Sequence, residues 1–464
     1  MNFLNNILLN TDSYKASHFL QYPAGTSGLF SYIESRGGEY DQTVFFGLQI
    51  LLKEYLARPI TATMIDEAEA FFAAHGEPFD SEGWRYILER YQGYLPVRIA
   101  AVPEGTVVAG RNILCAVECT DPRVFWCASY IEPLLLRIWY PITVATRSWS
   151  IKQTLRKFLS QTSDDPEGQL PFKLHDFGAR GVSSAESAAI GGCAHLVNFM
   201  GSDTVLGVMA ARQYYNEPMA AYSIPAAEHS TITSWGRDGE IEAYRNMIRR
   251  FAGPGKIYAV VSDSYDVYQA CDQLWGMALK QEVIDAGGLL VIRPDSGEPT
   301  EVVLRVAQLL ERRFGSTHNR KGYRVLNGVR IIQGDGVNAD SIRAILEQLC
   351  THGFAADNIA FGMGGALLQM LNRDTLKFAM KCSAILINGE WRDVYKDPAT
   401  DPGKTSKKGR LTLLRNDDSG EFMTTRTEKE IPSGWTPQLT PVWDTGKLLN
   451  DWSFSEIRSR ANSI

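Results

Sequence analysis

The amino-acid sequence predicts an α/β protein built from two parts, and two patterns carry this prediction. From about residue 170 onward, short apolar runs alternate with helical patterns, which is typical of a parallel sheet with crossover helices. Residues 1–160 instead mix strand-like runs with turn residues, which favours an antiparallel sheet. A chain of 464 residues is also too long for one ordinary small core. We therefore expect an antiparallel sheet with helices, followed by a parallel α/β part.

Composition narrows the class of protein. With 44% hydrophobic and 22% charged residues, the chain is typical of a soluble globular protein. The net charge of −6 argues against nucleic acid as the main partner. Seven scattered cysteines without a CxxC argue against a disulfide framework and a structural zinc site. The start lacks a signal peptide and no apolar run is long enough to span a bilayer, so we expect a cytoplasmic protein without a membrane segment.

The first 170 residues contain the following expected elements. A strand is expected over 28–35, and Val97–Gly110 has the pattern of a hairpin around Pro103-Glu104-Gly105. Helical patterns cover 45–57, 63–76 and about 123–160. The long apolar helix fits a core or a subunit contact better than a cofactor site. The polar run Ser160–Gly168 is the best linker candidate.

The second part alternates strands and helices. Strand candidates lie at 172–177, 219–224, 256–263, 288–295, 329–335 and 358–362. Helical patterns lie between several of them, at 239–252, 265–283, 300–314 and 340–350. This many units favours a closed barrel. An open doubly wound sheet is the alternative, although no GxGxxG motif supports it.

Nearly every strand candidate ends in a turn rich in polar residues or glycine. These turns are 175–180, 228–229, 262–266, 293–297, 334–336 and 362–365. In a parallel barrel they would all lie on the face where such barrels carry their active sites. One such turn is readily explained as a helix cap, but six on one face favour a functional site.

His229 illustrates how this argument works. A lone histidine beside Glu228, at a strand-to-helix junction, is more often a turn residue than a catalyst. Its position among the six polar turns favours chemistry instead.

The residue types in the turns point to phosphate and magnesium chemistry. Asp263, Asp266 and Asp295 supply the oxygen ligands that Mg²⁺ prefers, although Ser264 or Asp266 also fits a helix N-cap. Asp295 alternatively binds sugar hydroxyls, and Asp263 alternatively orients an imidazole. The guanidinium groups of Arg180 and Arg293 match planar oxyanions.

Further candidates for binding a ligand are aromatic, glycine and basic residues. Phe177 either stacks on an aromatic ligand or belongs to the core. The glycine turns at 334–336 and 364–365 let a phosphate approach the backbone, or are simply tight turns. A basic run after the barrel is either solvated or binds an anion, and it comprises Arg373, Lys381, Lys396, Lys404, Lys407, Lys408 and Arg410. The residues alone thus indicate an Mg²⁺-dependent enzyme acting on a phosphorylated sugar or nucleotide.

These same segments closely resemble the nicotinamide phosphoribosyltransferase family of type II phosphoribosyltransferases. The matching motifs run from residue 10 to residue 411 and include NTDSYKASH, HDFGARGVSS, GSDTV, YSIPAAEHSTITSWG, VSDSYDVYQAC, IRPDSGEP, IIQGDGV, FGMGGALLQ and KDPATDPGKTSKKGRL. The resemblance implies an incomplete α/β barrel over 170–389 and an α+β domain from both chain ends, 1–165 together with 390–464. It also implies a head-to-tail homodimer with active sites shared between the subunits.

The resemblance implies a reaction as well. Such enzymes condense nicotinamide with phosphoribosyl pyrophosphate to give nicotinamide mononucleotide and pyrophosphate, the entry step of NAD salvage. Mg²⁺ is the implied metal, bound mainly by substrate phosphates with Asp263 and Asp295. ATP is an implied cosubstrate, whose hydrolysis through a phosphohistidine enhances the reaction.

The resemblance also assigns roles to residues. His229 is matched to the phosphorylated histidine and Asp263 to the carboxylate that orients it. Phe177, with Tyr14 of the other subunit, is matched to the clamp on the pyridine ring. Asp203 is matched to the acceptor of the carboxamide NH₂, which would repel the carboxylate of nicotinic acid. Arg293 is matched to a residue that reaches either the carboxamide oxygen or the phosphate. The other phosphate and ribose contacts fall on Asp295, Gly334, Asp335, Gly364, Gly365 and Arg180, with Arg36, Arg373, Lys381, Lys396 and Lys404, several from the partner.

Two departures from the family pattern lie near the ring site. Phe172 replaces a tyrosine and Ala179 replaces a bulkier residue, and both bear on ring selectivity. The rival functions are a nicotinate or quinolinate phosphoribosyltransferase, a noncatalytic binding protein on the same fold, and a sugar-phosphate hydrolase. Asp203 argues against the first, because an acid substrate favours a basic residue there.

Overall fold

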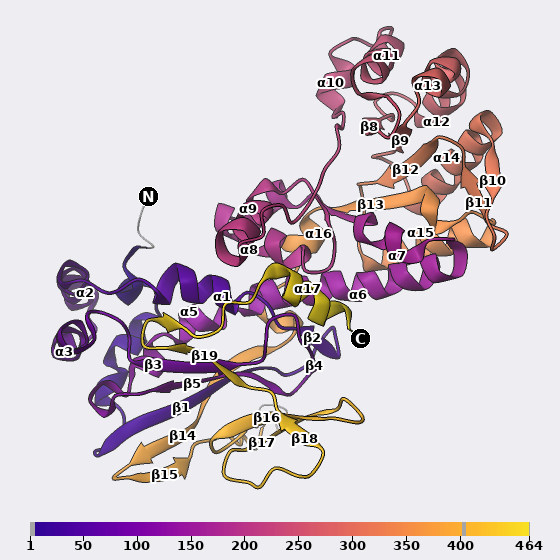
Figure 1. Cartoon of the computed structure of the whole chain (residues 1–464). Helices are drawn as coiled ribbons and strands as arrows, with labels where there is room; N and C mark the ends of the chain where they lie inside the picture. The colour runs from indigo at the N-terminus through magenta and orange to yellow at the C-terminus, as the bar shows by residue number, and fades with distance from the viewer. Residues whose placement is uncertain (1–4, 401–404, 464) are drawn as a thin grey trace. The chain divides into compact units, whose positions relative to one another are not determined.

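The computed structural model describes residues 5–400 and 405–463, and the chain forms two compact units (Figure 1). Unit 1 comprises Met1–Thr146, Gln213–Glu217 and Leu371–Ile464, and unit 2 comprises Arg147–Arg212 and Pro218–Met370. The boundaries predicted at 165/170 and 389/390 differ from these. One reason is that helix α6 (Trp139–Thr162) runs unbroken past Thr146, and the other is that strand β14 (Phe378–Ile387) belongs to the sheet of unit 1.

Unit 1 contains the expected antiparallel sheet. It has seven strands in the order β15-β14-β1-β5-β3-β19-β20, and every pairing is antiparallel. Besides β14, the strands are β1 (Thr26–Ser35), β3 (Val97–Ala101), β5 (Ile113–Cys119), β15 (Glu390–Asp393), β19 (Thr440–Asp444) and β20 (Lys447–Leu448). Both chain ends therefore contribute strands to one sheet, as the resemblance implies.

The predicted hairpin over Val97–Gly110 is wrong. Strand β3 pairs with β5 and β19, whereas β4 (Val107–Ala109) pairs with β2 (Gln42–Val44) in a separate small sheet. The turn between β3 and β4 is used for a tertiary contact, because buried Glu104 accepts hydrogen bonds from Gln49 N (2.7 Å) and Tyr215 Oη (2.7 Å).

The helices of unit 1 match the prediction in part. They include α1 (Leu48–Leu51), which continues as a wider turn over Leu52–Leu56, α2 (Ala62–His75), α3 (Ser81–Tyr91) and α17 (Phe454–Asn462). Those over 45–57 and 63–76 were predicted, whereas α3 and α17 were not. The single helix expected over 123–160 is broken into α4 (Cys127–Tyr130), α5 (Glu132–Leu136) and α6. Pro133 lies in the first turn of α5 and has no N–H for a helix arriving from α4, which explains the break. The expected linker at 160–168 contains the end of α6 and the start of α7 (Pro166–Gln169).

The remaining strands of unit 1 form a three-stranded sheet in the order β17-β16-β18. These strands are β16 (Leu411–Asn416), β17 (Phe422–Arg426) and β18 (Trp435–Pro437). All of them come from the C-terminal part of the chain.

Unit 2 contains a parallel sheet of six strands in the order β7-β6-β13-β12-β9-β8. The strands are β6 (Leu174–Asp176), β7 (Gly201–Ser202), β8 (Ile257–Val261), β9 (Leu289–Arg293), β12 (Val329–Gln333) and β13 (Ile359–Met363). The crossover helices include α8 (Ala185–His195), α9 (Val205–Tyr215), α11 (Glu240–Phe251), α14 (Pro299–Phe314) and α15 (Ala339–Thr351). The predicted α/β class is confirmed, and five of the six strand candidates are strands.

The sixth candidate, 219–224, explains why the barrel is incomplete. No strand forms there, and Tyr222 makes a single parallel bridge to Gly201 on β7, while Ala226 makes one to Ala259 on β8. Pro225 has no N–H and only accepts a hydrogen bond, from Ala259 N at 2.9 Å. The edges β7 and β8 are therefore linked through this segment by isolated bridges, and the six strands do not close into a full barrel.

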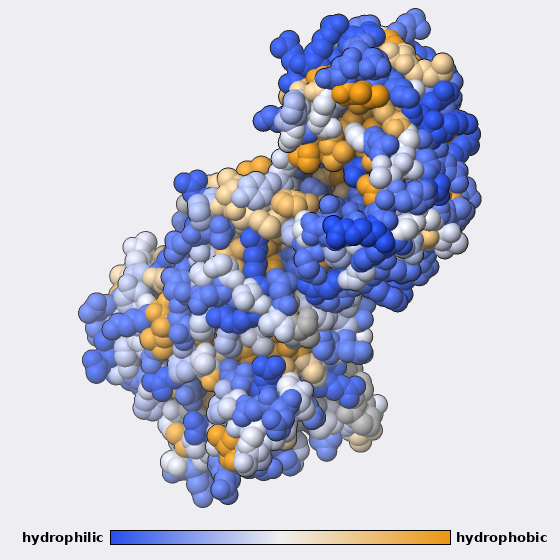
Figure 2. Space-filling model, turned by 45° about the vertical axis from the view of Figure 1, so that its right-hand side comes forward, coloured by the Kyte–Doolittle hydropathy of each residue, from blue (hydrophilic) through white to orange (hydrophobic). Residues whose placement is uncertain are grey.

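The interior of the parallel sheet is filled by small and branched side chains. Buried Ala259, Val291 and Ile332 form a cluster, and Phe177 and Ile224 pack against it. Within the described residues, no helix is long and apolar enough to cross a membrane. The surface in Figure 2 is mostly hydrophilic, with smaller hydrophobic patches.

Candidate active site

The polar turns predicted from the sequence meet at the carboxyl ends of the strands of unit 2. Asp176 and Arg293 are the last residues of β6 and β9, Asp263 follows β8, and Gly334 and Gly364 follow β12 and β13. The Glu228-His229 turn follows the segment that bridges β7 and β8. All parallel strands of a sheet end at one edge, so this edge collects the candidate site residues.

His229 is the first residue of helix α10 (His229–Thr233), and Glu228 is its N-cap. Glu228 and Thr231 form a reciprocal capping box, which fixes where the helix starts and where the imidazole projects. The ring is 45% exposed, and its Nε2 lies 3.6 Å from Asp263 Oδ1 and 3.4 Å from Asp295 Oδ2. Its Nδ1 lies 3.3 Å from Ser264 Oγ. The structure therefore brings His229 together with both predicted carboxylates.

The two carboxylates have different surroundings. Asp263 is nearly buried, and its Oδ2 accepts a hydrogen bond from Ser296 Oγ (2.5 Å). Its buried Oδ1 has no hydrogen-bond partner among residues 5–400 and 405–463. Asp295 Oδ2 accepts from an Arg293 guanidinium nitrogen at 3.1 Å. An unpaired buried carboxylate oxygen facing an imidazole is suited to a cation or an N–H donor.

These residues also bear on the predicted magnesium site. Over the part of the chain that the structure describes, no group of three or more His, Cys, Asp or Glu side chains is arranged to hold a metal. Mg²⁺ often binds through one or two carboxylates and completes its shell with water and substrate phosphates. Asp263 and Asp295 fit that arrangement. Asp266 does not take part, because its carboxylate caps α12 (Val267–Gln269) through the backbone N–H groups of Tyr268 and Gln269.

Phe177 follows β6 and is held against the end of the neighbouring strand β13. Its backbone N–H donates to Met363 O at 3.0 Å, and its ring lies on Gly362. A Cβ at Gly362 would be only 1.9 Å from Phe177 Cε2, so only glycine leaves room for the ring. One part of the ring packs on the interior cluster, but the residue is only partly buried. Phe177 therefore serves the core and also offers an aromatic surface to the site.

Asp203 lies one residue beyond β7, next to the strand that ends at Asp176. Its backbone N–H donates to Asp176 O (2.9 Å), and its exposed carboxylate accepts from Ser223 Oγ (2.5 Å). Ser223 lies on the bridging segment, between Tyr222 and Ile224. Burial lowers the pKa of the nearby His175 imidazole, and the Asp203 carboxylate opposes this shift. Asp203 is thus a fixed and accessible hydrogen-bond acceptor.

The other predicted residues of unit 2 lie on loops at the same edge. Arg180 is exposed within a short turn, Ala179–Gly181, and Gly181 packs closely on Gly365. Gly365 begins the four-residue helix α16 (Gly365–Leu368) and has open space where a side chain would be. Asp335 is exposed, while Phe172 is 42% exposed and its ring centroid lies 6.4 Å from that of Tyr222.

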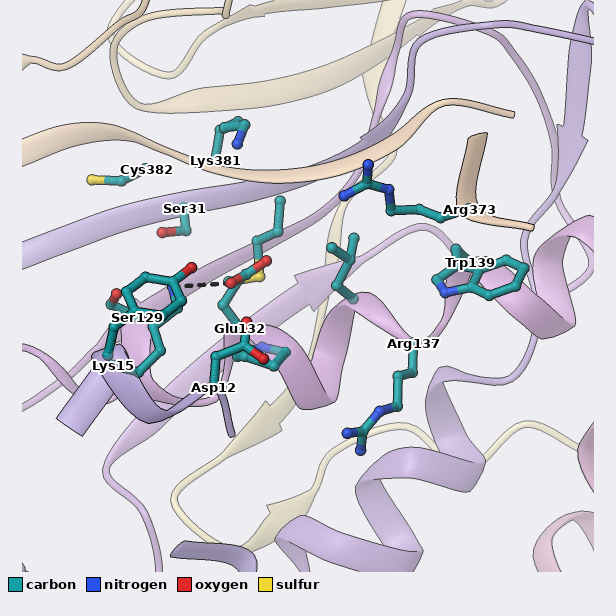
Figure 3. A pocket seen from close by; sticks show the side chains of 14 residues that line it. Asp12, Lys15, Ser31, Ser129, Glu132, Arg137, Trp139, Arg373, Lys381 and Cys382 are labelled. Atoms are coloured by element: carbon teal, nitrogen blue, oxygen red, sulfur yellow. Dashed lines mark ion pairs between the residues drawn. The ribbon is translucent and has the colours of Figure 1, made fainter. Parts of the chain in front are cut away.

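The remaining predicted residues lie in unit 1, around two cavities. The first cavity has a volume of about 530 Å³ and is lined by Tyr14, Lys15, Glu132, Arg373 and Lys381 among others (Figure 3). Tyr14 is 52% exposed, and Lys15 forms an ion pair with Glu132 at 2.9 Å. Lys381, on β14, and Arg373 both line this cavity and are labelled in Figure 3.

The second cavity, of about 840 Å³, is strongly basic. Its charged lining residues are the cations Arg36, Arg111, Arg373, Lys377, Lys381, Lys396 and Lys407 and the carboxylates Glu34 and Asp374. Buried Glu34 forms ion pairs with Arg36 and Lys407. Burial, and then the charge of Arg36, lowers the pKa of Lys381. Arg373 and Lys381 line both cavities, so the two cavities adjoin.

Four predicted phosphate-binding residues, Arg36, Arg373, Lys381 and Lys396, therefore share this cavity. Lys404 lies outside the described residues. Lys408 and Arg410 of the basic run are not among the cavity residues. Lys408 lies over the ring of Tyr395 (4.8 Å) and Arg410 over that of Trp391 (5.0 Å).

Several site residues were not predicted from the sequence. Arg111 follows Gly110, far from the basic run, whereas Lys377 lies within that run, between Arg373 and Lys381, and was not singled out. Ser223 and Ser296 are ordinary loop serines. Glu34 gave no signal, because a carboxylate at a strand end is common. Lys15 and Tyr14 are in the same NTDSYK motif, so neighbourhood in the motif was the one available clue for Lys15.

The family models and the curated relatives that match this chain all describe nicotinate or nicotinamide phosphoribosyltransferases. The model of the nicotinate phosphoribosyltransferase (NAPRTase) family matches residues 172–431, and that of the nicotinamide phosphoribosyltransferase N-terminal domain matches residues 6–99. A nicotinamide phosphoribosyltransferase of Xanthomonas campestris pv. campestris is 59% identical and covers 100% of this chain and 99% of its own length. One from Acinetobacter baylyi is 32% identical, with 99% and 98% covered.

Solved structures support the fold. A nicotinate-nucleotide pyrophosphorylase of Pyrococcus furiosus has a TM-score of 0.65 at 17% identity, covering 98% of this chain and 95% of that one. Human nicotinic acid phosphoribosyltransferase has a TM-score of 0.64 at 15% identity, covering 97% and 92%. The predicted incomplete barrel with an added α+β domain is thereby confirmed. From its matches over the whole length, the chain belongs to the nicotinate phosphoribosyltransferase family, among its nicotinamide phosphoribosyltransferases, and is a phosphoribosyltransferase enzyme.

Proposed function

We propose that this enzyme transfers the phosphoribosyl group of phosphoribosyl pyrophosphate to nicotinamide, giving nicotinamide mononucleotide and pyrophosphate. The observation that carries the choice of nicotinamide is the Asp203 carboxylate, exposed and held by Ser223 Oγ at 2.5 Å. A fixed acceptor binds the NH₂ of a carboxamide but repels the carboxylate of nicotinic acid. The relatives at 59% and 32% identity carry the same activity in their names.

The proposed reaction is a substitution at C1 of the ribose. The pyridine nitrogen attacks C1, a C–N bond forms, the C1–O bond to pyrophosphate breaks, and the electron pair leaves with pyrophosphate. Phe177 would stack on the pyridine ring and aim its nitrogen at C1, so that the reacting atoms meet without a further entropy cost. Arg180 and Arg293 would neutralise phosphate oxygens, and Asp295 would bind the ribose hydroxyls. The backbone turns at Gly334-Asp335 and Gly364-Gly365 would lie against the ribose phosphate.

Mg²⁺ is the proposed metal, held by Asp263 and Asp295 together with substrate phosphates. When bound, it would supply positive charge to the leaving pyrophosphate. The unpaired Oδ1 of Asp263 is the feature that best supports such a ligand.

His229 is the proposed site of phosphorylation by ATP. The ring nitrogen without a proton would attack the γ-phosphorus, the P–O bond to ADP would break, and water would later hydrolyse the phosphohistidine to inorganic phosphate. Asp263 and Asp295, near Nε2, would fix the tautomer and the ring orientation. The exposed fraction of the ring, 45%, leaves it accessible to a nucleotide.

Unit 1 would supply the rest of the site to a partner subunit. Tyr14, at the first cavity, would form the second wall of the pyridine clamp, and the adjoining basic cavity would bind the phosphates. An aromatic residue in one cavity and basic residues in the adjoining one are suited to a pyridine ring beside a phosphorylated sugar. We therefore propose a head-to-tail homodimer. We also propose that the enzyme is cytoplasmic, since its seven cysteines are free thiols, as is typical of a reducing compartment.

The test is an incubation of the pure protein with phosphoribosyl pyrophosphate, Mg²⁺ and either nicotinamide or nicotinic acid. We expect mononucleotide from the amide and little from the acid. Product from the acid alone would instead make the protein a nicotinate phosphoribosyltransferase. Failure with both pyridines would favour a binding protein or a hydrolase. Release of ribose phosphate would identify the hydrolase.

A second experiment tests His229. We expect His229→Ala to abolish ATP hydrolysis while slow synthesis without ATP remains, because the histidine makes no bond to the sugar. His229→Gln provides a polar control of similar size. An unchanged ATPase rate in either variant would remove His229 from this role.

A further inference from the structure

Two basic residues of the second cavity have an unusual backbone conformation. Arg111 has a φ of 66° and Lys377 a φ of 49°, and both line the cavity. Among the described residues, six non-glycine residues have positive φ, and two of these are asparagines, which tolerate it. For other residues the left-handed conformation costs about 1–2 kcal/mol. The chain thus accepts this cost at two cations of one cavity.

The surrounding backbone explains how these conformations are held. Arg111 N donates to Ser35 O at 2.8 Å, and Gly110 N donates to Asp41 O at 2.8 Å. On the other side, Leu376 O accepts from Ser35 Oγ at 2.9 Å. The loops that carry Arg111 and Lys377 are therefore both fixed to the end of β1, next to Arg36. These contacts use backbone atoms and Ser35, so the fold does not depend on the arginine or lysine side chain.

The charges in the cavity point to an anionic ligand. Its seven cations and two carboxylates leave a formal net charge of +5. Glu34 is occupied by Arg36 and Lys407, and Asp374 lies 3.2 Å from Arg373. Within residues 5–400 and 405–463, the side chains of Arg111 and Lys377 have neither a hydrogen-bond nor an ion-pair partner. Like charges crowded in a cavity repel one another until an anion neutralises them.

We propose that Arg111 and Lys377 are additional phosphate-binding residues, which contact the phosphate chain of a polyphosphate ligand in the second cavity. Pyrophosphate and a nucleoside triphosphate share this chemistry. Arg373 and Lys381 line both cavities, whereas Arg111 and Lys377 line only the second. The latter two would therefore contact phosphates away from Tyr14, which lines the first cavity. As a statement about the phosphate end of the active site, the inference rests on the proposed function.

Glycine substitutions separate binding from folding. Arg111→Gly and Lys377→Gly each remove a cation and also relieve the backbone, since glycine readily adopts positive φ. Isothermal titration of the full-length variants with inorganic pyrophosphate, and separately with ATP, should give Kd values raised about ten- to a hundredfold per variant, the usual effect of losing one charge-assisted contact. The melting temperature should stay the same or rise.

Two controls complete the experiment. Arg111→Lys and Lys377→Arg keep the charge and should restore most of the affinity. Gln92→Gly relieves an exposed left-handed residue outside both cavities, so it should leave both Kd values unchanged. An effect on pyrophosphate alone assigns the residues to the transfer reaction, and one on ATP alone assigns them to the nucleotide.

Unchanged Kd values for both probes in both glycine variants would overturn the proposal, as would failure of the wild type to bind either probe. Neither probe is titrated together with nicotinamide and phosphoribosyl pyrophosphate, so the outcome is independent of the proposed transfer reaction. A wild type that makes no mononucleotide but loses phosphate affinity on substitution would refute the function and keep the inference. If the wild type makes mononucleotide but the glycine variants bind both probes normally, the proposed function stands and the inference is refuted.

Discussion

Asp176, the last residue of β6, is a buried acid at the sheet edge that collects the candidate site residues. Burial raises its pKa to about 6 from 3.8, although the backbone N–H of Gly178 donates to Oδ1 at 2.7 Å and opposes the shift. The folded protein therefore binds more protons here than the unfolded chain between these two pH values. Stability from this group is present below pH 3.8 and is lost as the pH rises through about 6.

Asp176→Asn replaces the acid by a neutral group of the same shape. We expect the free energy of unfolding of the variant, relative to wild type, to increase between pH 4 and about 6 and then to stay constant, because only the wild type becomes charged. Urea unfolding across this range measures the difference. A difference that is independent of pH would show that Asp176 does not titrate in this window.

Asp203 sets the proposed choice between amide and acid. Asp203→Asn should lower the ratio of kcat/KM for nicotinamide to that for nicotinic acid about tenfold, because the repelling charge is removed while the shape is kept. Asp285→Asn removes an equal charge from exposed α13 (Lys280–Ala286) and serves as the control. If the ratio is the same in all three proteins, discrimination lies elsewhere.

At the scale of elements, the glycine turn after β13 depends on another helix. Helix α16 has only four residues, too few to be stable alone. Buried Arg147 on α6 donates from one guanidinium nitrogen to Ala366 O (2.6 Å) and Met370 O (2.8 Å), at the end of α16. This contact fixes the segment that begins at Gly364-Gly365.

Arg147→Met should therefore loosen this turn. We expect a loss of about 2–3 kcal/mol in the free energy of unfolding, since two buried carbonyls lose a charged donor. We also expect the KM for phosphoribosyl pyrophosphate to rise more, relative to wild type, than the KM for nicotinamide. Steady-state kinetics and urea unfolding measure the two effects. Arg156→Met, on the same helix but paired with Gln153 and Glu167, should change neither KM, and equal effects of both variants would contradict this role.

At the scale of the whole molecule, the proposed active site needs unit 2 of one subunit and unit 1 of the other. Asp295→Ala damages the first half and Tyr14→Ala the second. In a random mixture of the two variants, half of the dimers are mixed and one of their two sites is intact, so about a quarter of wild-type activity should return. Activity is measured after joint refolding or coexpression, with each variant alone as the control. No recovery would show that each site comes from a single chain.

The sequence predicted the parallel sheet and most of its strands because buried parallel strands are continuous apolar runs that end in polar turns. Residues 219–224 were predicted as a strand for the same reason. Hydropathy indicates that Ile224 packs against the core, but it does not show that Pro225 limits the segment to isolated bridges. The hairpin over Val97–Gly110 failed similarly, because the partner of a strand is a tertiary choice.

The candidate site, like the fold, was predicted in part from the sequence and decided in part by the tertiary structure. The sequence by itself determined which residues end the strands, and parallel geometry then placed His229, Asp263 and Asp295 at one edge. Only the tertiary structure decided that both carboxylates face one imidazole nitrogen, within 3.6 Å. It also decided that Arg111, Arg36 and Lys377, far apart in the chain, line one basic cavity. Local patterns record burial and chain direction, whereas distances between side chains depend on how separate segments pack together.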